Sequence, residues 1–114
     1  MTGIIIQNSP VLNTQGDQSK LLYQVPTITI SETGTYDFTG IQAANIFGGL
    51  SPAQGPVITI DAATLVTTQS ITFVNTGMKP VVLRLSNGGT VGGKLDYVLM
   101  PGNVTFQFDG TNLD

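Results

Sequence analysis

The chain has 114 residues, of which 40% are hydrophobic and only 10% charged, against about 25% charged in an average soluble protein. Four cations and seven carboxylates give a net charge of −3, which argues against binding to nucleic acid or an anionic membrane, because both require clustered Lys or Arg. The sequence contains no His and no Cys, so the usual general base and thiolate chemistry are missing. We therefore expect no catalytic site, no metal site and no cofactor.

The first 26 residues differ from the rest of the chain. Two apolar pieces, Gly3–Gln7 and Leu21–Val25, flank a polar link, and Pro26 favours extended backbone at the residue before it. The pattern fits an extended N-terminal arm or a first edge strand, and it fits an ordinary strand pair within the same core equally well. An arm could add a strand to a neighbour's sheet while its apolar side chains fill pockets there. The residues expected to make this partner contact are Ile4, Ile5, Ile6, Val11, Leu12, Leu21, Leu22 and Tyr23.

From Thr27 onward, short segments alternate between apolar and polar residues, which is the period of a strand with one buried face. Three of them are near relatives: TITISETG at 27–34, SITFVNTG at 70–77 and VTFQFDG at 104–110. Turn residues separate the segments at intervals of roughly 8–12 residues, as in sandwiches and barrels. The predicted strands are Thr27–Ser31, Thr35–Phe38, Val57–Asp61, Ser70–Asn75, Val81–Ser86, Leu95–Met100 and Val104–Asp109.

The segment Gly40–Leu50 does not follow the strand pattern. It is compatible with a single helical turn around Ala43 and Ile46, or with a loop over one end of the core. No long helical period appears in the chain, so βαβ units and a parallel sheet are not expected. We predict an all-β fold, an antiparallel jelly-roll-like β-sandwich over residues 27–114, preceded by the arm or edge strand over residues 1–26.

Alternation also divides each strand into a buried row and an exposed row. The predicted core residues are Ile28, Ile30, Tyr36, Phe38, Ile58, Ile60, Ile71, Phe73, Leu83, Leu85, Tyr97, Leu99, Phe106 and Phe108, with Val81 or Val82. The opposite row is polar and barely charged, and consists of Thr27, Thr29, Thr59, Thr72, Arg84 and Gln107. Rows of this kind occur on solvated faces and also where sheets of adjacent subunits meet. The sequence leaves that choice open.

Two short motifs could carry chemistry, and each has a simpler structural interpretation. GGTVGGK at Gly88–Lys94 matches the start of a phosphate-binding loop, but Leu95 stands where that loop needs a hydroxyl for magnesium. A glycine-rich hairpin loop is therefore favoured. Asp109–Asp114 spaces oxygen atoms as a calcium loop does, but it lacks the bidentate glutamate, so a terminal turn is favoured.

The segment Ser70–Asn112 contains SITFVNTG, PVVLRLSNGG, YVLMPGN and VTFQFDGTN. It resembles structural modules of tailed-bacteriophage virions, in which an N-T-G turn, a P-V-x-L strand and a closing P-G-x-x-x-F-x-x-D-G-T-N hairpin recur. The whole chain looks most like a small capsid decoration, or cement, protein. This resemblance implies a jelly-roll-like sandwich on the outer capsid surface that clasps adjacent major capsid subunits and has no catalytic residues.

From the resemblance we expect a protein made in the host cytoplasm and located on the virion, with the major capsid protein as its partner. We also expect a homo-oligomer, either a dimer or a trimer. Two other functions stay open. The Thr- and Asn-rich strands and the D-G-T-N ending suggest a trimeric tail or fibre module, and Tyr23, Tyr36 or Tyr97 could serve a carbohydrate-binding β-sandwich. An enzyme is the least expected class.

The arm interpretation predicts that deleting residues 1–12 abolishes partner binding while the remaining chain still melts cooperatively. The reason is that an arm contributes contacts to the partner and none to its own core. Thermal unfolding followed by circular dichroism, together with a binding assay on the same sample, measures both properties. A truncated chain that does not fold would identify the segment as a core strand instead.

Overall fold

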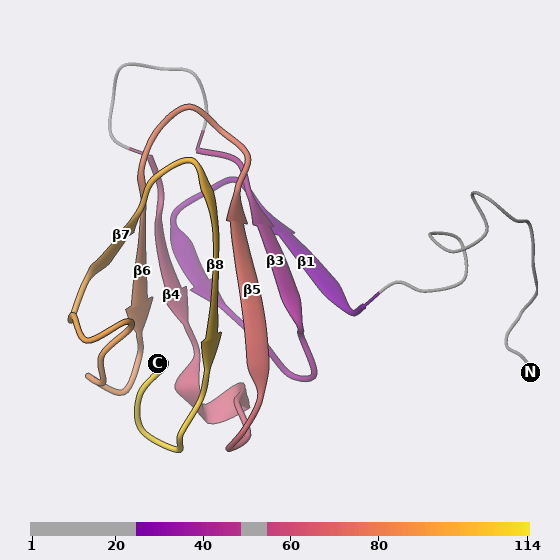
Figure 1. The fold of residues 1–114 in the computed structure, drawn as a ribbon, viewed down its shortest axis with the longest axis vertical. Coiled ribbons are helices and arrows are strands. Elements are labelled where there is room, and N and C mark those ends of the chain that lie inside the picture. The colour runs from indigo at the N-terminus through magenta and orange to yellow at the C-terminus, as the bar shows by residue number, and fades with distance from the viewer. Residues whose placement is uncertain (1–24, 49–54) are drawn as a thin grey trace, which may run out of the picture.

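The computed structural model describes residues 25–48 and 55–114. These residues form eight short strands and one 3-10 helix (Figure 1). The strands are β1 (Thr27–Ile30), β2 (Gly34–Tyr36), β3 (Ala43–Ile46), β4 (Val57–Ile60), β5 (Ser70–Asn75), β6 (Val81–Leu85), β7 (Tyr97–Leu99) and β8 (Gly102–Gln107). The helix η1 spans Ala62–Thr64, and the Asp61 side chain caps it by accepting a hydrogen bond from the backbone N–H of Ala63.

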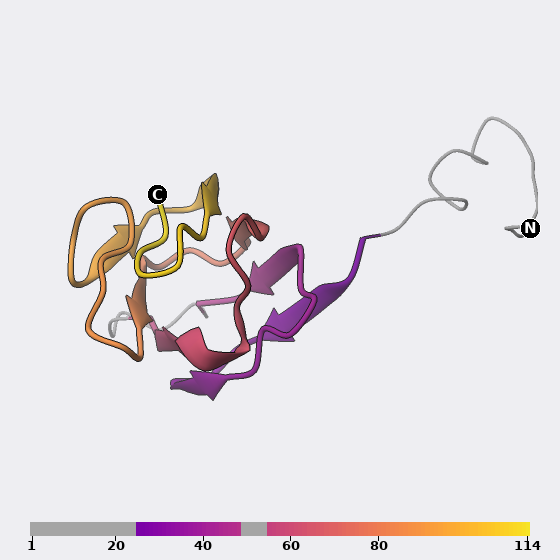
Figure 2. The same cartoon turned by 90° about the horizontal axis from the view of Figure 1, so that it is seen from below.

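The strands form two sheets of four strands each. The first sheet has the order β1-β3-β5-β8 and the second has the order β2-β4-β6-β7. From β1 to β6 the chain changes sheet at every connection, so strands two apart in the sequence become neighbours and pair in parallel. β7 and β8 then run antiparallel to β6 and β5. Figure 2 shows the two sheets as facing layers, with β1 and the C-terminal segments on opposite sides.

The predicted antiparallel jelly-roll-like sandwich is wrong. Four of the six strand pairs are parallel, and both sheets are mixed, with almost no helix. Parallel pairing is unexpected in a sequence without long helical segments, because a helix usually returns the chain between parallel strands. In this fold a strand of the opposite sheet makes each return. Two successive strands lie in opposite sheets and bury their apolar rows against the same core. The opposite sheet therefore covers that core, and no helix is needed.

β3 lies within the segment that was expected to be a helical turn or a loop, and that expectation is also wrong. Ala44 and Ile46 are fully buried, whereas Asn45 between them is exposed, so the segment has the period of a strand. β3 lies between β1 and β5 and pairs with both. Pairing on two sides outweighs the low intrinsic β-propensity of Ala and Asn, because strand preference depends on tertiary context.

The seven predicted strands are present, with end points shifted by at most two residues. Most of the predicted core is confirmed, although Ile28, Tyr36 and Tyr97 are only half-buried. Of the two alternatives in β6, Val81 belongs to the core cluster. The core residues that the sequence analysis missed are Ala44, Ile46, Leu65, Val91 and Leu113.

Aromatic rings form the centre of the core. Phe73 is fully buried, and its ring centroid lies 5.9 Å from that of Phe38 and 6.2 Å from that of Phe106. Tyr97 on the second sheet meets the Phe106 ring edge-on at 5.1 Å. The rings therefore join the two sheets, and such aromatic pairs add about 0.5–1.5 kcal/mol each beyond the area they bury.

Replacing Phe73 with Ala should lower the free energy of unfolding by about 3–5 kcal/mol, because a large ring leaves a cavity that its neighbours fill only in part. Val66→Ala is the matched control, since this side chain is 66% exposed and its loss should change stability by no more than about 0.5 kcal/mol. Urea unfolding followed by circular dichroism measures both values. Similar losses for the two variants would contradict the central position of Phe73.

Candidate functional site

The residues predicted for partner contact lie outside the residues that the structure describes. They are Ile4, Ile5, Ile6, Val11, Leu12, Leu21, Leu22 and Tyr23. The division into an arm over residues 1–26 and a domain over residues 27–114 therefore stays a prediction. The candidate surface described next is built from other residues, on the outer side of the first sheet.

The outer side of the first sheet is an uncharged surface, which we call the threonine face. It consists of Thr27, Thr29, Ala43, Asn45, Ser70, Thr72, Val74, Asn103, Thr105 and Gln107, and all of them are exposed or half-buried. Strand register arranges most of them in two rows that cross the sheet. One row is Thr27, Ala43, Thr72 and Thr105, and the next is Thr29, Asn45, Val74 and Asn103. None of these side chains carries a charge, so a partner could cover the face without burying an ion.

Several polar groups on the threonine face already have hydrogen-bond partners. The hydroxyls of Thr72 and Thr105 lie 2.8 Å apart on neighbouring strands. The Thr27 hydroxyl donates to the carbonyl of Val25 at 2.8 Å, and the Gln107 side-chain amide donates to the carbonyl of Thr68 at 3.2 Å. Dehydrating a polar group that keeps its partner costs less than dehydrating a free one. Covering these partnered groups therefore costs less than covering free polar groups would.

The outer side of the second sheet is different, because it carries an ion pair. Arg84 donates to Asp96 through two parallel hydrogen bonds, Nε to Oδ1 at 2.7 Å and Nη2 to Oδ2 at 3.0 Å. These bonds raise the pKa of Arg84 and lower the pKa of the Asp96 carboxyl. Both side chains are about half exposed. Such a charged pair is typical of a solvated face, so the two sheets present contrasting surfaces.

The polar row predicted from the sequence is therefore divided between two surfaces. Thr27, Thr29, Thr72 and Gln107 lie on the threonine face, whereas Thr59 and Arg84 lie side by side on the second sheet. Alternation indicates which residues point away from the core, but it does not indicate the sheet to which each strand belongs. The threonine face could not be recognised from the sequence for that reason.

One buried polar side chain secures the end of the domain at which the β5–β6 turn lies, which is the upper end in Figure 1. Asn75 is 3% exposed, and its amide nitrogen donates to the carbonyls of Lys79 at 2.7 Å and Leu99 at 3.0 Å. Its oxygen accepts from the N–H of Gly77 at 3.0 Å. Asn75 thus connects the β5–β6 turn to the end of β7. The neighbouring side chains of Met78 and Met100 are well exposed, which adds two flexible apolar contacts at this end.

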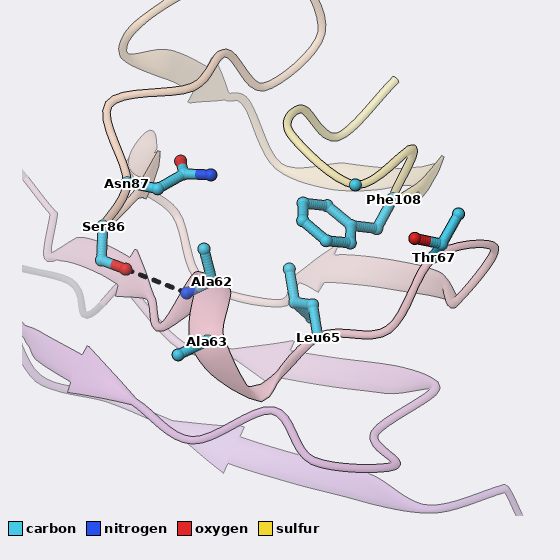
Figure 3. Close-up of a pocket in the computed structure, with 8 residues that line it drawn as sticks. Ala62, Ala63, Leu65, Thr67, Ser86, Asn87 and Phe108 are labelled. Atoms are coloured by element: carbon cyan, nitrogen blue, oxygen red, sulfur yellow. Dashed lines mark hydrogen bonds between the residues drawn. The ribbon is translucent and has the colours of Figure 1, made fainter.

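A hollow of about 520 Å³ lies at the lower end, between η1 and the C-terminal segment (Figure 3). Leu65 and Phe108 supply its apolar part, and the Ser86 hydroxyl accepts a hydrogen bond from the N–H of Ala62 at 2.9 Å. The other lining residues are Ala63, Thr67, Asn87 and Gly110. None of these eight residues has a side chain that titrates near neutral pH, so they offer no group for acid–base chemistry.

The glycine-rich motif forms a hairpin, as the structural interpretation predicted. Val91 and Lys94 make an antiparallel bridge with backbone hydrogen bonds in both directions. Gly92 and Gly93 between them have φ values of 57° and 83°, which is the conformation of a tight type I′ turn. Val91 is fully buried. The glycines therefore serve the turn and the core, and no helix follows them as a phosphate-binding loop requires.

The Asp109–Asp114 segment forms a closing turn, which also agrees with the structural interpretation. The Asp109 carboxylate accepts hydrogen bonds from the backbone N–H groups of Asn112 at 2.7 Å and Thr111 at 2.8 Å. These two bonds lower the pKa of the Asp109 carboxyl. The turn directs Leu113 into the core, where its backbone bonds to Thr90 and Gly92. The carboxylate is thus engaged by its own backbone.

The tyrosines proposed for carbohydrate binding do not form one platform. Tyr36 lies on β2 and Tyr97 on β7, which are the opposite edge strands of the second sheet. The Tyr36 hydroxyl donates to the carbonyl of Glu32, and the Tyr97 ring packs against Phe106. Tyr23 lies outside the described residues.

Residues 25–48 and 55–114 contain no cluster of three or more His, Cys, Asp or Glu side chains that could hold a metal ion. Within the same residues, no helix has the length and apolar character needed to cross a membrane. The sequence matches no protein-family model, and neither a curated protein nor a solved structure matches the chain.

Asp109→Ala should lower the melting temperature at pH 7, and the melting temperature of this variant should fall less between neutral and low pH than that of the wild type. The carboxyl pKa is lower in the folded state than in the unfolded chain, so the stabilisation is present above about pH 4 and disappears as the pH falls through the folded-state value. Melting temperatures measured between pH 7 and pH 2 test this. Asp109→Asn is the control, because it keeps an acceptor oxygen and removes the titration. Parallel pH profiles for wild type and Asp109→Ala would contradict the assignment.

Proposed function

We propose that the protein is a non-enzymatic virion structural protein that binds the outer capsid surface and stabilises contacts between major capsid subunits. The observation that supports this function is the threonine face. It provides a sheet surface without charge whose polar groups are partly satisfied within the protein. A surface of this kind can be covered by another protein without burying an ion.

The charge distribution supports contact through the first sheet. Interface centres are depleted in charged residues, because a buried ion needs a partner to offset its loss of hydration. The threonine face meets this condition, whereas the second sheet presents the Arg84–Asp96 pair. In the proposed orientation the threonine face meets the capsid and the second sheet remains hydrated.

The resemblance to phage virion modules involves the same part of the molecule. Ser70–Asn112 includes β5 and β8, which supply two of the four strands of the threonine face. The face is only four strands wide, so a single contact would be small. Repetition of a weak contact over a capsid lattice would supply the necessary avidity. The predicted partner is the major capsid protein, and the predicted location is the outer surface of the virion.

Mixing the full-length protein with undecorated capsids tests this proposal. We expect stoichiometric occupancy and a higher temperature of capsid disruption, measured by sedimentation and by light scattering on heating. Absence of binding at micromolar concentration would overturn the proposal. Labelling of the tail instead of the capsid in virion images would also overturn it and would support the tail or fibre module.

Asn45→Glu locates the contact surface. This residue is exposed at the centre of the threonine face, and a carboxylate there would lose its hydration on binding, so affinity should fall at least about tenfold. Thr59→Glu is the matched control on the outer side of the second sheet, and it should bind like the wild type. Circular dichroism verifies that both variants fold. Equal affinity of the two variants would exclude the threonine face as the contact surface.

A further inference from the structure

The outer edge of β1 exposes backbone hydrogen-bonding groups. The carbonyl of Pro26 accepts from the N–H of Ala43, and the carbonyl of Ile30 accepts from the N–H of Phe47. Because backbone groups alternate in direction along a strand, the even-numbered residues bond to β3, and Thr27 and Thr29 direct their N–H and C=O groups outward. Within residues 25–48 and 55–114, β1 pairs with β3 alone, so nothing in that part of the chain covers this edge.

β1 lacks the features that usually prevent edge-to-edge association. Its sequence, TITI, contains no charge and no proline, and no residue of the strand has a positive φ that would mark a bulge. As far as residues 25–48 and 55–114 are concerned, the edge is therefore an open template for another strand.

We propose that the β1 edges of two copies of this chain pair antiparallel about a two-fold axis at Ile28. Thr27 of one copy then lies opposite Thr29 of the other, and each residue donates one hydrogen bond to its partner and accepts one from it. Both threonines point to the outer side, so the pleats match and the threonine face continues across the dimer. Ile28 meets its own symmetry mate on the inner side as a non-hydrogen-bonded pair, in which Cα atoms lie about 4.5 Å apart.

Two observations favour a second copy at this edge over head-to-tail pairing with β8. The carbonyl of Gln107 at the β8 edge already accepts a hydrogen bond from the N–H of Asp114 at 3.0 Å, so the C-terminal segment occupies part of that edge. The edge strands on the side away from β8 and β7 are β1 and β2, and they carry the half-buried side chains of Ile28 and Tyr36. A two-fold partner would cover both of them. A closed dimer also leaves no repeating contact that could extend into a filament.

Sedimentation of the full-length chain at high micromolar concentration should give twice the 12.0 kDa mass of the monomer. Thr29→Pro should weaken the dimer at least about tenfold, because it removes an outward N–H for which residues 25–48 and 55–114 provide no acceptor. Asn103→Pro is the matched control, since this residue directs its N–H outward from the β8 edge, and it should leave the dimer intact. Dissociation by Asn103→Pro in place of Thr29→Pro would overturn the proposal. A wild type that stays monomeric at this concentration would also overturn it.

Ile28→Cys gives a second and geometric test, because the natural chain contains no cysteine. The expected separation in the dimer lies within the range of a disulfide, so mild oxidation should link two chains through this residue. Asn45→Cys, one strand further in, should link far more slowly. Equal rates would overturn the two-fold arrangement. The dimer does not depend on the capsid role. Asn45→Glu distinguishes the dimer proposal from the capsid proposal, because this variant should lose capsid binding while it still sediments with the mass of a dimer.

Discussion

Two sheets pack against one shared core, and this packing dictates the path of the chain. Each strand from β1 to β6 buries one row of side chains there, and the next strand in the chain buries its row from the opposite side. The chain can therefore return to the first sheet only after it has crossed the second. Parallel pairing follows directly from this path, and the return strand performs the covering role that a helix has in βαβ units.

This arrangement produces two outer surfaces of different character. The threonine face carries no charge, whereas the second sheet holds the exposed Arg84–Asp96 pair. The same winding leaves β1 and β2 as the first strands of their sheets, with no earlier strand in the described part of the chain to cover them. A surface suited to a partner and an edge suited to a second copy thus arise on the same sheet, and they can be tested separately.

The two motifs that suggested chemistry serve the closure of the core. The Gly92–Gly93 turn returns the chain so that Val91 is buried, and the Asp109 turn does the same for Leu113. Val91 and Leu113 form a bridge, so the two turns stabilise one another at the lower end of the domain. Glycine-rich and aspartate-rich segments also occur in phosphate and calcium sites, but here the glycines and Asp109 fix the backbone conformation of two turns.

The sequence by itself determined the positions of seven strands, most of the core and the structural role of both turns. These features depend on local properties, namely a two-residue period and turn chemistry that read the same in any context. Strand direction, the β3 strand and the burial of Val91 and Leu113 were decided by the tertiary structure alone. Parallel and antiparallel strands bury the same alternate row, so the period contains no information about direction. Which strands become neighbours depends on contacts between residues far apart in the chain, and these contacts exist only once the two sheets have packed.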